Sequence, residues 1–265
     1  MASPLFSPLR LPSGSVLSNR VARRRRRRTW LARVSCPIGS CSSCTGVGAP
    51  GAGLLITGNV MVHAEALTGP AGAVFDDAAP LEPFAKWARA GRPGGAAAWM
   101  QVNHPGRLVE ADMPGVVWGP SAGGVDIGRQ SDWFGVPVAM TAEQISDTVE
   151  RFAVTAARAE QAGFDGVEVH AAHGYLLSQF LSPLVNRRTD EWGGSLEKRA
   201  RLLLDVVRAV RAADSPTVAG VVKLNSADLQ RGGFDADDAR RVIEWLEPLG
   251  VDLSSCPVAA TRAPP

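Results

Sequence analysis

The sequence predicts an α/β fold with a parallel sheet, in the form of an incomplete (β/α)8 TIM barrel. Short apolar runs alternate with segments of helical periodicity, which is the pattern of βαβ units. No Gly-x-Gly-x-x-Gly turn follows any of these runs, which argues against a dinucleotide-binding doubly wound sheet. We count about six βα units, including a disrupted first strand, where a closed barrel has eight.

The first predicted elements are a buried strand, a helix and a second strand. The apolar run at 53–57 is followed by Gly58–Asn59, which is typical of the end of a buried strand. Residues 80–90 have a helical pattern, and the run at 96–102 leads directly into the loop HPGRL. Residues 110–138 are rich in Gly, Pro and Ser and lack periodicity, so we expect a long excursion over the mouth of the barrel.

Capping signals mark the helices of the second half. Gln144 lies three residues after Thr141, as in a capping box, and apolar residues then recur at helical spacing until Gly163. The remaining predicted elements are, in order, a strand at 166–170, a helix after Ser195, a strand at 218–224, a helix from Asp235 to Gly250 and a strand from 251.

The composition is that of an ordinary globular domain. The 265 residues are 45% hydrophobic and 20% charged, with a net charge of +2, and they suffice for one sizeable core. No apolar stretch approaches the roughly 20 residues that a membrane helix needs. We therefore expect a cytoplasmic protein with no membrane partner.

Three residues with acid–base chemistry accompany the predicted strand at 166–170. His170 ends that strand, and His173 and Tyr175 lie in the loop behind it. The ends of barrel strands commonly carry catalytic residues. Two imidazoles and a phenol can donate hydrogen bonds to an anionic oxygen and a proton to the neighbouring carbon. The alternatives are a structural histidine, a metal-binding pair without an evident third ligand, and a tyrosine that only packs its ring.

Three motifs carry a family resemblance. The sequences HAAHGYLLSQFLSP at 170–183, NRRTDEWGGSLEKR at 186–199 and HPGRL at 104–108 resemble the old yellow enzyme family of FMN-dependent NADH:flavin oxidoreductases and ene-reductases. The resemblance covers most of 54–252 and a short piece at 5–21. It implies a barrel that binds FMN, with NADH or NADPH as the reductant. The implied substrate is a small molecule, an activated alkene or a quinone-like acceptor.

The resemblance also implies roles for the three catalytic candidates. Tyr175 would protonate the alkene carbon opposite the one that takes hydride. His170 and His173 would bind the carbonyl or nitro oxygen of the substrate and stabilise the enolate as it forms. His170 is also expected to contact the flavin.

Two further residues are expected to bind the flavin by resemblance. Gln101, before the HPGRL loop, would bind the pyrimidine edge, where an amide offers both donor and acceptor. Lys223 stands where the family usually has arginine, and its charge beside flavin N1 and O2 would favour the reduced flavin. The alternative for Gln101 is a polar cap of its strand, while His104 and Arg107 are expected to order their loop.

The segment at 23–50 departs from the family pattern. No Asp or Glu precedes Glu65, and Arg23–Arg28 is an unbroken run. Such a segment is typical of a transit peptide, of a basic nucleic-acid or nuclear-import patch, or of translation out of frame. We favour the third, because neighbouring frames of plausible codons restore family-like sequence here and in the tail at 254–265. The barrel would then start at 1–22 and continue as an FMN-binding domain at 51–253.

Three cysteines in this segment, Cys36, Cys41 and Cys44, lack a second cluster, so no metal site is expected. An incomplete barrel is expected to bind FMN weakly or not at all, so that this chain has little activity. The alternative from another class is a non-catalytic nucleic-acid-binding protein with a basic tail on a decayed barrel. It requires an exposed Arg23–Arg28 run and salt-dependent binding. A dienoyl reductase with an iron–sulfur cluster remains a neighbouring possibility within the superfamily.

Overall fold

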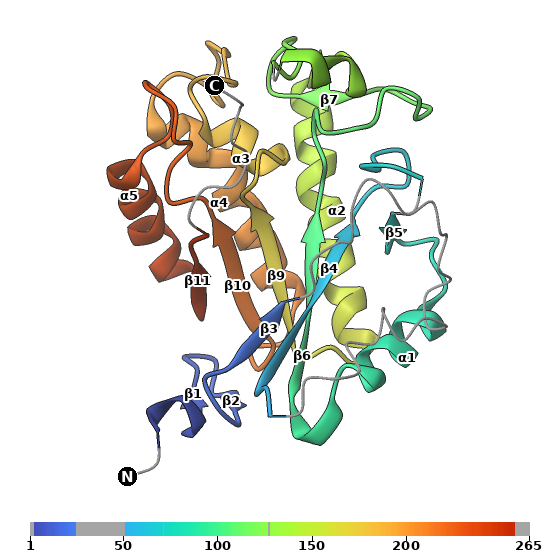
Figure 1. Ribbon diagram of the computed structural model, residues 1–265, viewed down its shortest axis with the longest axis vertical. Helices are drawn as coiled ribbons and strands as arrows, with labels where there is room; N and C mark the ends of the chain where they lie inside the picture. The colour runs from blue at the N-terminus through green and yellow to red at the C-terminus, as the bar shows by residue number, and fades with distance from the viewer. Residues whose placement is uncertain (1–2, 25–50, 71, 127, 258–265) are drawn as a thin grey trace.

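The computed structural model describes residues 3–24, 51–70, 72–126 and 128–257. Within them, six parallel strands form one curled sheet whose order follows the sequence without reversal (Figure 1). The strands are β3 (Ala22–Arg24), β4 (Leu54–Met61), β6 (Ala97–Asn103), β9 (Gly166–Ala171), β10 (Ala219–Leu224) and β11 (Leu253–Ser255), and the short β5 (Ala73–Val74) pairs with β4. A sequential parallel order is that of a barrel, so the predicted incomplete (β/α)8 fold is confirmed.

Helices alternate with these strands and cover one face of the sheet. The α-helices are α1 (Leu81–Ala90), α2 (Ala142–Gln161), α3 (Leu176–Leu181), α4 (Leu196–Ala213) and α5 (Ala236–Leu246). Helices α2 and α4 pack side by side behind the sheet in Figure 1. No helix in the described part of the chain has the length and apolarity needed to span a bilayer.

The predicted helix signals are confirmed. Thr141 Oγ1 accepts a hydrogen bond from Gln144 N (3.3 Å), and Gln144 Oε1 accepts one from Thr141 N (2.9 Å), so the capping box is complete. Asp235 Oδ1 accepts from Asp238 N at 2.9 Å and begins α5. The helix itself ends at Leu246, earlier than predicted, and the 3₁₀ turn η4 (Glu247–Leu249) continues it to Gly250. Gly250 has φ +75°, a left-handed conformation that ends this turn at little cost for glycine.

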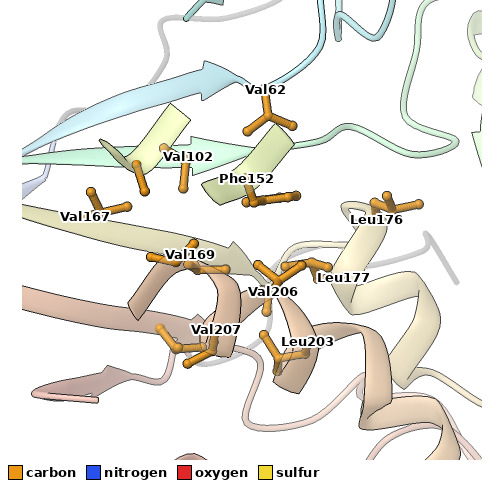
Figure 2. Packing of buried hydrophobic residues seen from close by; sticks show 14 of the residues in the cluster. Val62, Val102, Phe152, Val167, Val169, Leu176, Leu177, Leu203, Val206 and Val207 are labelled. Carbon is orange, nitrogen blue, oxygen red and sulfur yellow. The ribbon is translucent and has the colours of Figure 1, made fainter. Parts of the chain in front are cut away.

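The main core lies between the sheet and the helices (Figure 2). Val167 and Val169 on β9 point outward to Phe152 of α2 and to Val206 and Val207 of α4. All five side chains are at most 2% exposed. Burial of each contributes about 1.5–3 kcal/mol, so this layer fixes the position of β9, which carries the candidate site.

A second apolar cluster fills the barrel interior near the amino ends of the strands. The antiparallel hairpin of β1 (Leu9–Arg10) and β2 (Val16–Leu17) covers it. Its buried members are Leu11, Leu17, Leu54, Ile56, Trp99, Ala219 and Val221. The opposite, carboxyl ends of the strands are therefore the ones left for polar chemistry.

The predicted excursion is a folded segment at the carboxyl ends of the strands. It contains β7 (Trp118–Gly119) and the 3₁₀ turn η3 (Gly128–Trp133), and β7 pairs in parallel with β8 (Val138–Ala139). Arg188 Nη1 donates to Pro120 O (3.0 Å) and Met140 O (2.7 Å), which ties the excursion to the loop before α4.

The first strand is made by the start of the arginine run. Arg23 and Arg24 pair in parallel with Leu55 and Ile56 of β4. Residues 25–50 and 258–265, with Cys36, Cys41 and Cys44, lie outside the described residues. The out-of-frame interpretation of 23–50 and 254–265 therefore stays a prediction.

Candidate active site

The side chains inside the curled sheet become polar toward the carboxyl ends of its strands. Register partners in parallel strands point to the same face, and residues two apart share a face. Gln101 on β6 is the partner of Glu168 on β9, and His170 is the partner of Lys223 on β10. All four side chains are at most 7% exposed. The structure thus brings three predicted site residues together with Glu168, which the sequence analysis missed.

Glu168 is the centre of the polar interior. Both Nη atoms of Arg24 donate to its two carboxylate oxygens. Gln101 Nε2 donates to Oε2 at 2.5 Å, and Ser255 Oγ donates to Oε1 at 3.1 Å. Arg24 and Ser255 belong to β3 and β11, the two ends of the strand order, so Glu168 connects both edges of the sheet across its concave side.

The loop after β9 brings the three predicted catalytic residues together. The rings of His170 and His173 are nearly perpendicular with centroids 5.1 Å apart, and the Tyr175 ring stands edge-on to His170 at 4.9 Å. Tyr175 is the N-cap residue of α3, whose Leu176 and Leu177 are buried in the core. Packing of this short helix therefore fixes the phenol beside the imidazoles.

Hydrogen bonds assign the tautomers of the two histidines. Ala172 N donates to His170 Nδ1 at 3.3 Å, so the proton of His170 is on Nε2. That nitrogen lies 3.3 Å from His173 Nδ1 and donates to it. The proton of His173 is then on Nε2, and this N–H is the donor that the pair can offer to a ligand.

Burial keeps both imidazoles neutral. Burial, followed by the charges of His173, Lys223 and Arg24, lowers the pKa of His170 well below its usual value. Burial, followed by the charges of Lys223 and Arg24, lowers the pKa of His173 to about 4. A neutral pair donates a hydrogen bond without a charge of its own, which suits an oxygen that gains negative charge during a reaction.

Lys223 is a buried cation. Burial, and then the charge of Arg24, lowers the pKa of its ammonium to about 8, while Glu168 acts in the opposite direction. Within the described residues, no hydrogen bond or salt bridge is formed by its Nζ. The residue is 7% exposed, but its Nζ is not among the fully buried atoms that lack a partner, so this ammonium is open to a ligand with electron-rich atoms.

Two residues of the HPGRL loop have structural contacts. His104 Nδ1 accepts from Gly106 N at 3.1 Å, and burial lowers the pKa of this histidine to about 3. Arg107 N donates to Gln179 Oε1 at 3.2 Å, and its Nη1 donates to Gly124 O at 3.1 Å. His104 thus contacts its own loop, and the Arg107 side chain joins that loop to the excursion; that both residues are structural stays a prediction.

The arginine run gives little support to the nucleic-acid alternative. Arg24 is turned into the barrel and its guanidinium is paired with the buried Glu168. Arg23 is exposed, and Arg25–Arg28 lie outside the described residues.

Known proteins resemble this chain in sequence and in structure. The profile of the NADH:flavin oxidoreductase / NADH oxidase family matches residues 44–261. An NADPH dehydrogenase of Halalkalibacterium halodurans is 41% identical over 172 residues, 64% of this chain and 48% of its own length. The NADH-dependent flavin oxidoreductase nadA of Aspergillus parasiticus is 37% identical over 74% of this chain and 45% of its own.

Solved structures of old yellow enzymes and related reductases also resemble this chain. The old yellow enzyme homologue from Zymomonas mobilis has a TM-score of 0.83 and 26% identity, over 96% of this chain and 73% of that one. Morphinone reductase in complex with tetrahydroNAD has a TM-score of 0.78 and 26% identity, over 96% and 74%. The chain spans about half the length of the curated relatives it matches. It belongs to the NADH:flavin oxidoreductase / NADH oxidase family, the old yellow enzymes, whose cofactor is FMN and whose reductant is NADH or NADPH.

Proposed function

We propose that this chain contains the flavin-facing and substrate-facing residues of an NAD(P)H-dependent oxidoreductase that reduces an activated alkene of the enone type or a quinone-like acceptor. The observation that carries the proposal is the ammonium of Lys223, which forms no hydrogen bond or salt bridge within the described residues. Lys223 is the register partner of His170 in the pairing of β10 with β9. When bound, FMN would accept hydride from NADH or NADPH and deliver it to the acceptor.

The residues fit the acceptor-rich edge of a flavin. Lys223 would supply a positive charge to the pyrimidine oxygen and nitrogen. Gln101 gives one amide hydrogen to Glu168 and has its carbonyl and a second N–H for the same ring edge.

The loop after β9 would act on the acceptor. The Nε2–H of His173 would bind the carbonyl or nitro oxygen, while His170 orients that ring through its own Nε2–H. A hydrogen bond to this oxygen strengthens as negative charge develops on it and polarises the double bond. Tyr175, held beside His170, would give its phenolic proton to the carbon that becomes nucleophilic.

Titration of the purified chain with FMN tests the binding. We expect weak but saturable binding, which Lys223→Met weakens about tenfold or more, because a hydrogen bond to a charged group contributes about 1.5–3 kcal/mol. Lys86→Met is the matched control, since the side chain of Lys86 is 63% exposed on α1. If the chain retains FMN in stoichiometric amount through purification, the expectation of weak FMN binding is wrong. Absence of saturable binding contradicts the proposed function.

Replacement of Tyr175 by phenylalanine tests the proton transfer. With FMN saturating, we expect alkene reduction to fall about a hundredfold, because general acid catalysis contributes at least about that factor. Oxidation of NADPH by the flavin in the absence of alkene should be unchanged, because it needs no proton from the phenol. Stopped-flow traces of the two half-reactions separate the effects, and an unchanged alkene rate excludes Tyr175 as the donor.

A further inference from the structure

Two successive residues of the loop after β9 have left-handed backbone. His173 has φ +61° and Gly174 has φ +75°. In the described ranges, Leu229 is the other non-glycine residue with a positive φ. For a residue with a β-carbon this conformation costs about 1–3 kcal/mol. Contacts from outside the loop must therefore hold His173 in place.

Asn225 and Ser178 provide these contacts. Asn225 Oδ1 accepts from His173 N at 3.0 Å, and Asn225 Nδ2 donates to Ser178 Oγ at 3.2 Å. The same hydroxyl oxygen accepts from Gly174 N at 3.3 Å. Asn225 is 8% and Ser178 5% exposed, so little water competes for these bonds.

These bonds join three elements at the carboxyl end of the sheet. Asn225 follows the last residue of β10, two positions after Lys223, and Ser178 lies on α3. Both backbone amides that they hold belong to the loop between β9, which carries His170, and α3, which begins after Tyr175. A shift at the amide of His173 would move its ring relative to His170 Nε2, which lies 3.3 Å from its Nδ1.

We propose that Asn225 is a positioning residue, which holds His173 in its left-handed conformation and thereby aims the His173 Nε2–H at the acceptor oxygen. This inference rests on the proposed function, because that function gives the N–H its role. A residue that only stabilised the fold would act on all parts of the molecule alike. Replacement of a positioning residue should change the surroundings and the pKa of His173 and leave the pKa of distant histidines unchanged.

The histidines of the chain are suitable reporters. There are four: His63, His104, His170 and His173. Burial and the charges of Lys223 and Arg24 hold the pKa of His173 at about 4, so movement of its ring toward solvent should raise that pKa toward 6.5. His63 follows β4 and His104 follows β6, and their ring centroids are 6.2 Å apart. Neither lies in the loop after β9, so both serve as internal controls.

The decisive variant is Asn225→Leu. Leucine removes both hydrogen bonds and keeps the branched shape and the number of heavy atoms of the side chain, and a polar cavity of about 90 Å³ adjoins Asn225. In pH titrations followed by ¹⁵N NMR of the imidazoles, we expect the pKa of His173 to rise by about one unit or more, with His63 and His104 unchanged. An unchanged pKa of His173 in this variant overturns the proposal. An equal shift in the pKa of all four histidines overturns it as well.

Hydrogen exchange gives a second measurement. The His173 amide should exchange at least about tenfold faster in Asn225→Leu, because its acceptor is gone. Asn225→Asp keeps an oxygen for this amide and should restore its protection. Ser178→Ala should speed exchange of the Gly174 amide more than that of the His173 amide, because the Ser178 hydroxyl accepts from Gly174 N. Protection of His173 that is equal in the leucine and aspartate variants contradicts the proposal. None of these measurements uses FMN, so they succeed or fail independently of the proposed function.

Discussion

Replacement of Glu168 by glutamine is expected to lower the free energy of unfolding by about 3–5 kcal/mol. Glu168 is fully buried, and its carboxylate receives both Nη atoms of Arg24, the amide of Gln101 and the hydroxyl of Ser255. Glutamine has the same shape, but it leaves the Arg24 guanidinium in the barrel without a counter-charge. Removal of one partner of a buried pair costs more than the pair itself contributes, because the remaining charge, here on an Arg24 side chain that is 27% exposed, stays largely desolvated.

Urea unfolding of a double-mutant cycle measures this effect. Arg24→Met should also destabilise the chain, since the carboxylate then lacks its cation. The double variant Arg24→Met/Glu168→Gln should be more stable than the sum of the two losses predicts, by at least about 1 kcal/mol.

An exposed ion pair provides the control. Arg240 and Glu244 pair on α5 with side chains 61% and 56% exposed. Glu244→Gln should change the free energy of unfolding by less than about 1 kcal/mol, because water screens this pair. If Glu168→Gln costs no more than this control, the polar interior does not connect the sheet edges as described.

The strands and helix caps could be predicted because their signals are local. The capping box at Thr141 involves residues three apart, and the strand signal of β9 lies within its own six residues, all of which are buried. Glu168 could also have been predicted from the sequence. It precedes His170 by two residues, so both side chains must point to the same face of the sheet. A charged residue inside a buried strand needs a partner, and this reasoning identifies it without a structure.

The partners of these residues could not be predicted, because they come from distant segments. Arg24 lies 144 positions before Glu168, in a run of identical residues that has neither alternation nor apolar character. Only pairing with β4 makes it a strand, which is a tertiary effect that overrides local preference. The contact of Asn225 with His173 spans 52 positions and depends on the register of β9 with β10. The candidate site was therefore predictable in its residues, but not in the network that positions them.

Replacement of Asp214 by asparagine is expected to stabilise the chain at pH 8, by at most about 4 kcal/mol. Asp214 is the C-cap residue of α4 and is 7% exposed. Neither of its carboxylate oxygens has a hydrogen-bond partner in the described part of the chain. Burial, and then the charge of Glu160, raises its pKa from 3.8 to about 7, against the opposing effect of Arg211. At 1.36 kcal/mol per pKa unit, this rise gives the stated upper limit.

The sign of the pH dependence follows from proton binding. Between about pH 4 and pH 7 the folded chain keeps the proton on Asp214, and the unfolded chain has lost it. The free energy of unfolding contributed by this group therefore falls as pH rises through that range, and it is constant above it. Asparagine cannot ionise, so the gain in Asp214→Asn should be near zero at pH 4 and largest above pH 7.

Urea unfolding at pH 5 and pH 8 checks this dependence. Asp112→Asn is the control, because Asp112 is exposed in the excursion and its replacement should have the same small effect at both pH values. Glu160→Gln should give part of the gain, since it removes the negative charge that acts on Asp214 and keeps an amide oxygen that can accept from Ser215 N. A gain in Asp214→Asn that is equal at pH 5 and pH 8 would mean that asparagine acts through hydrogen bonding, and that the buried carboxyl is not the proton-binding group.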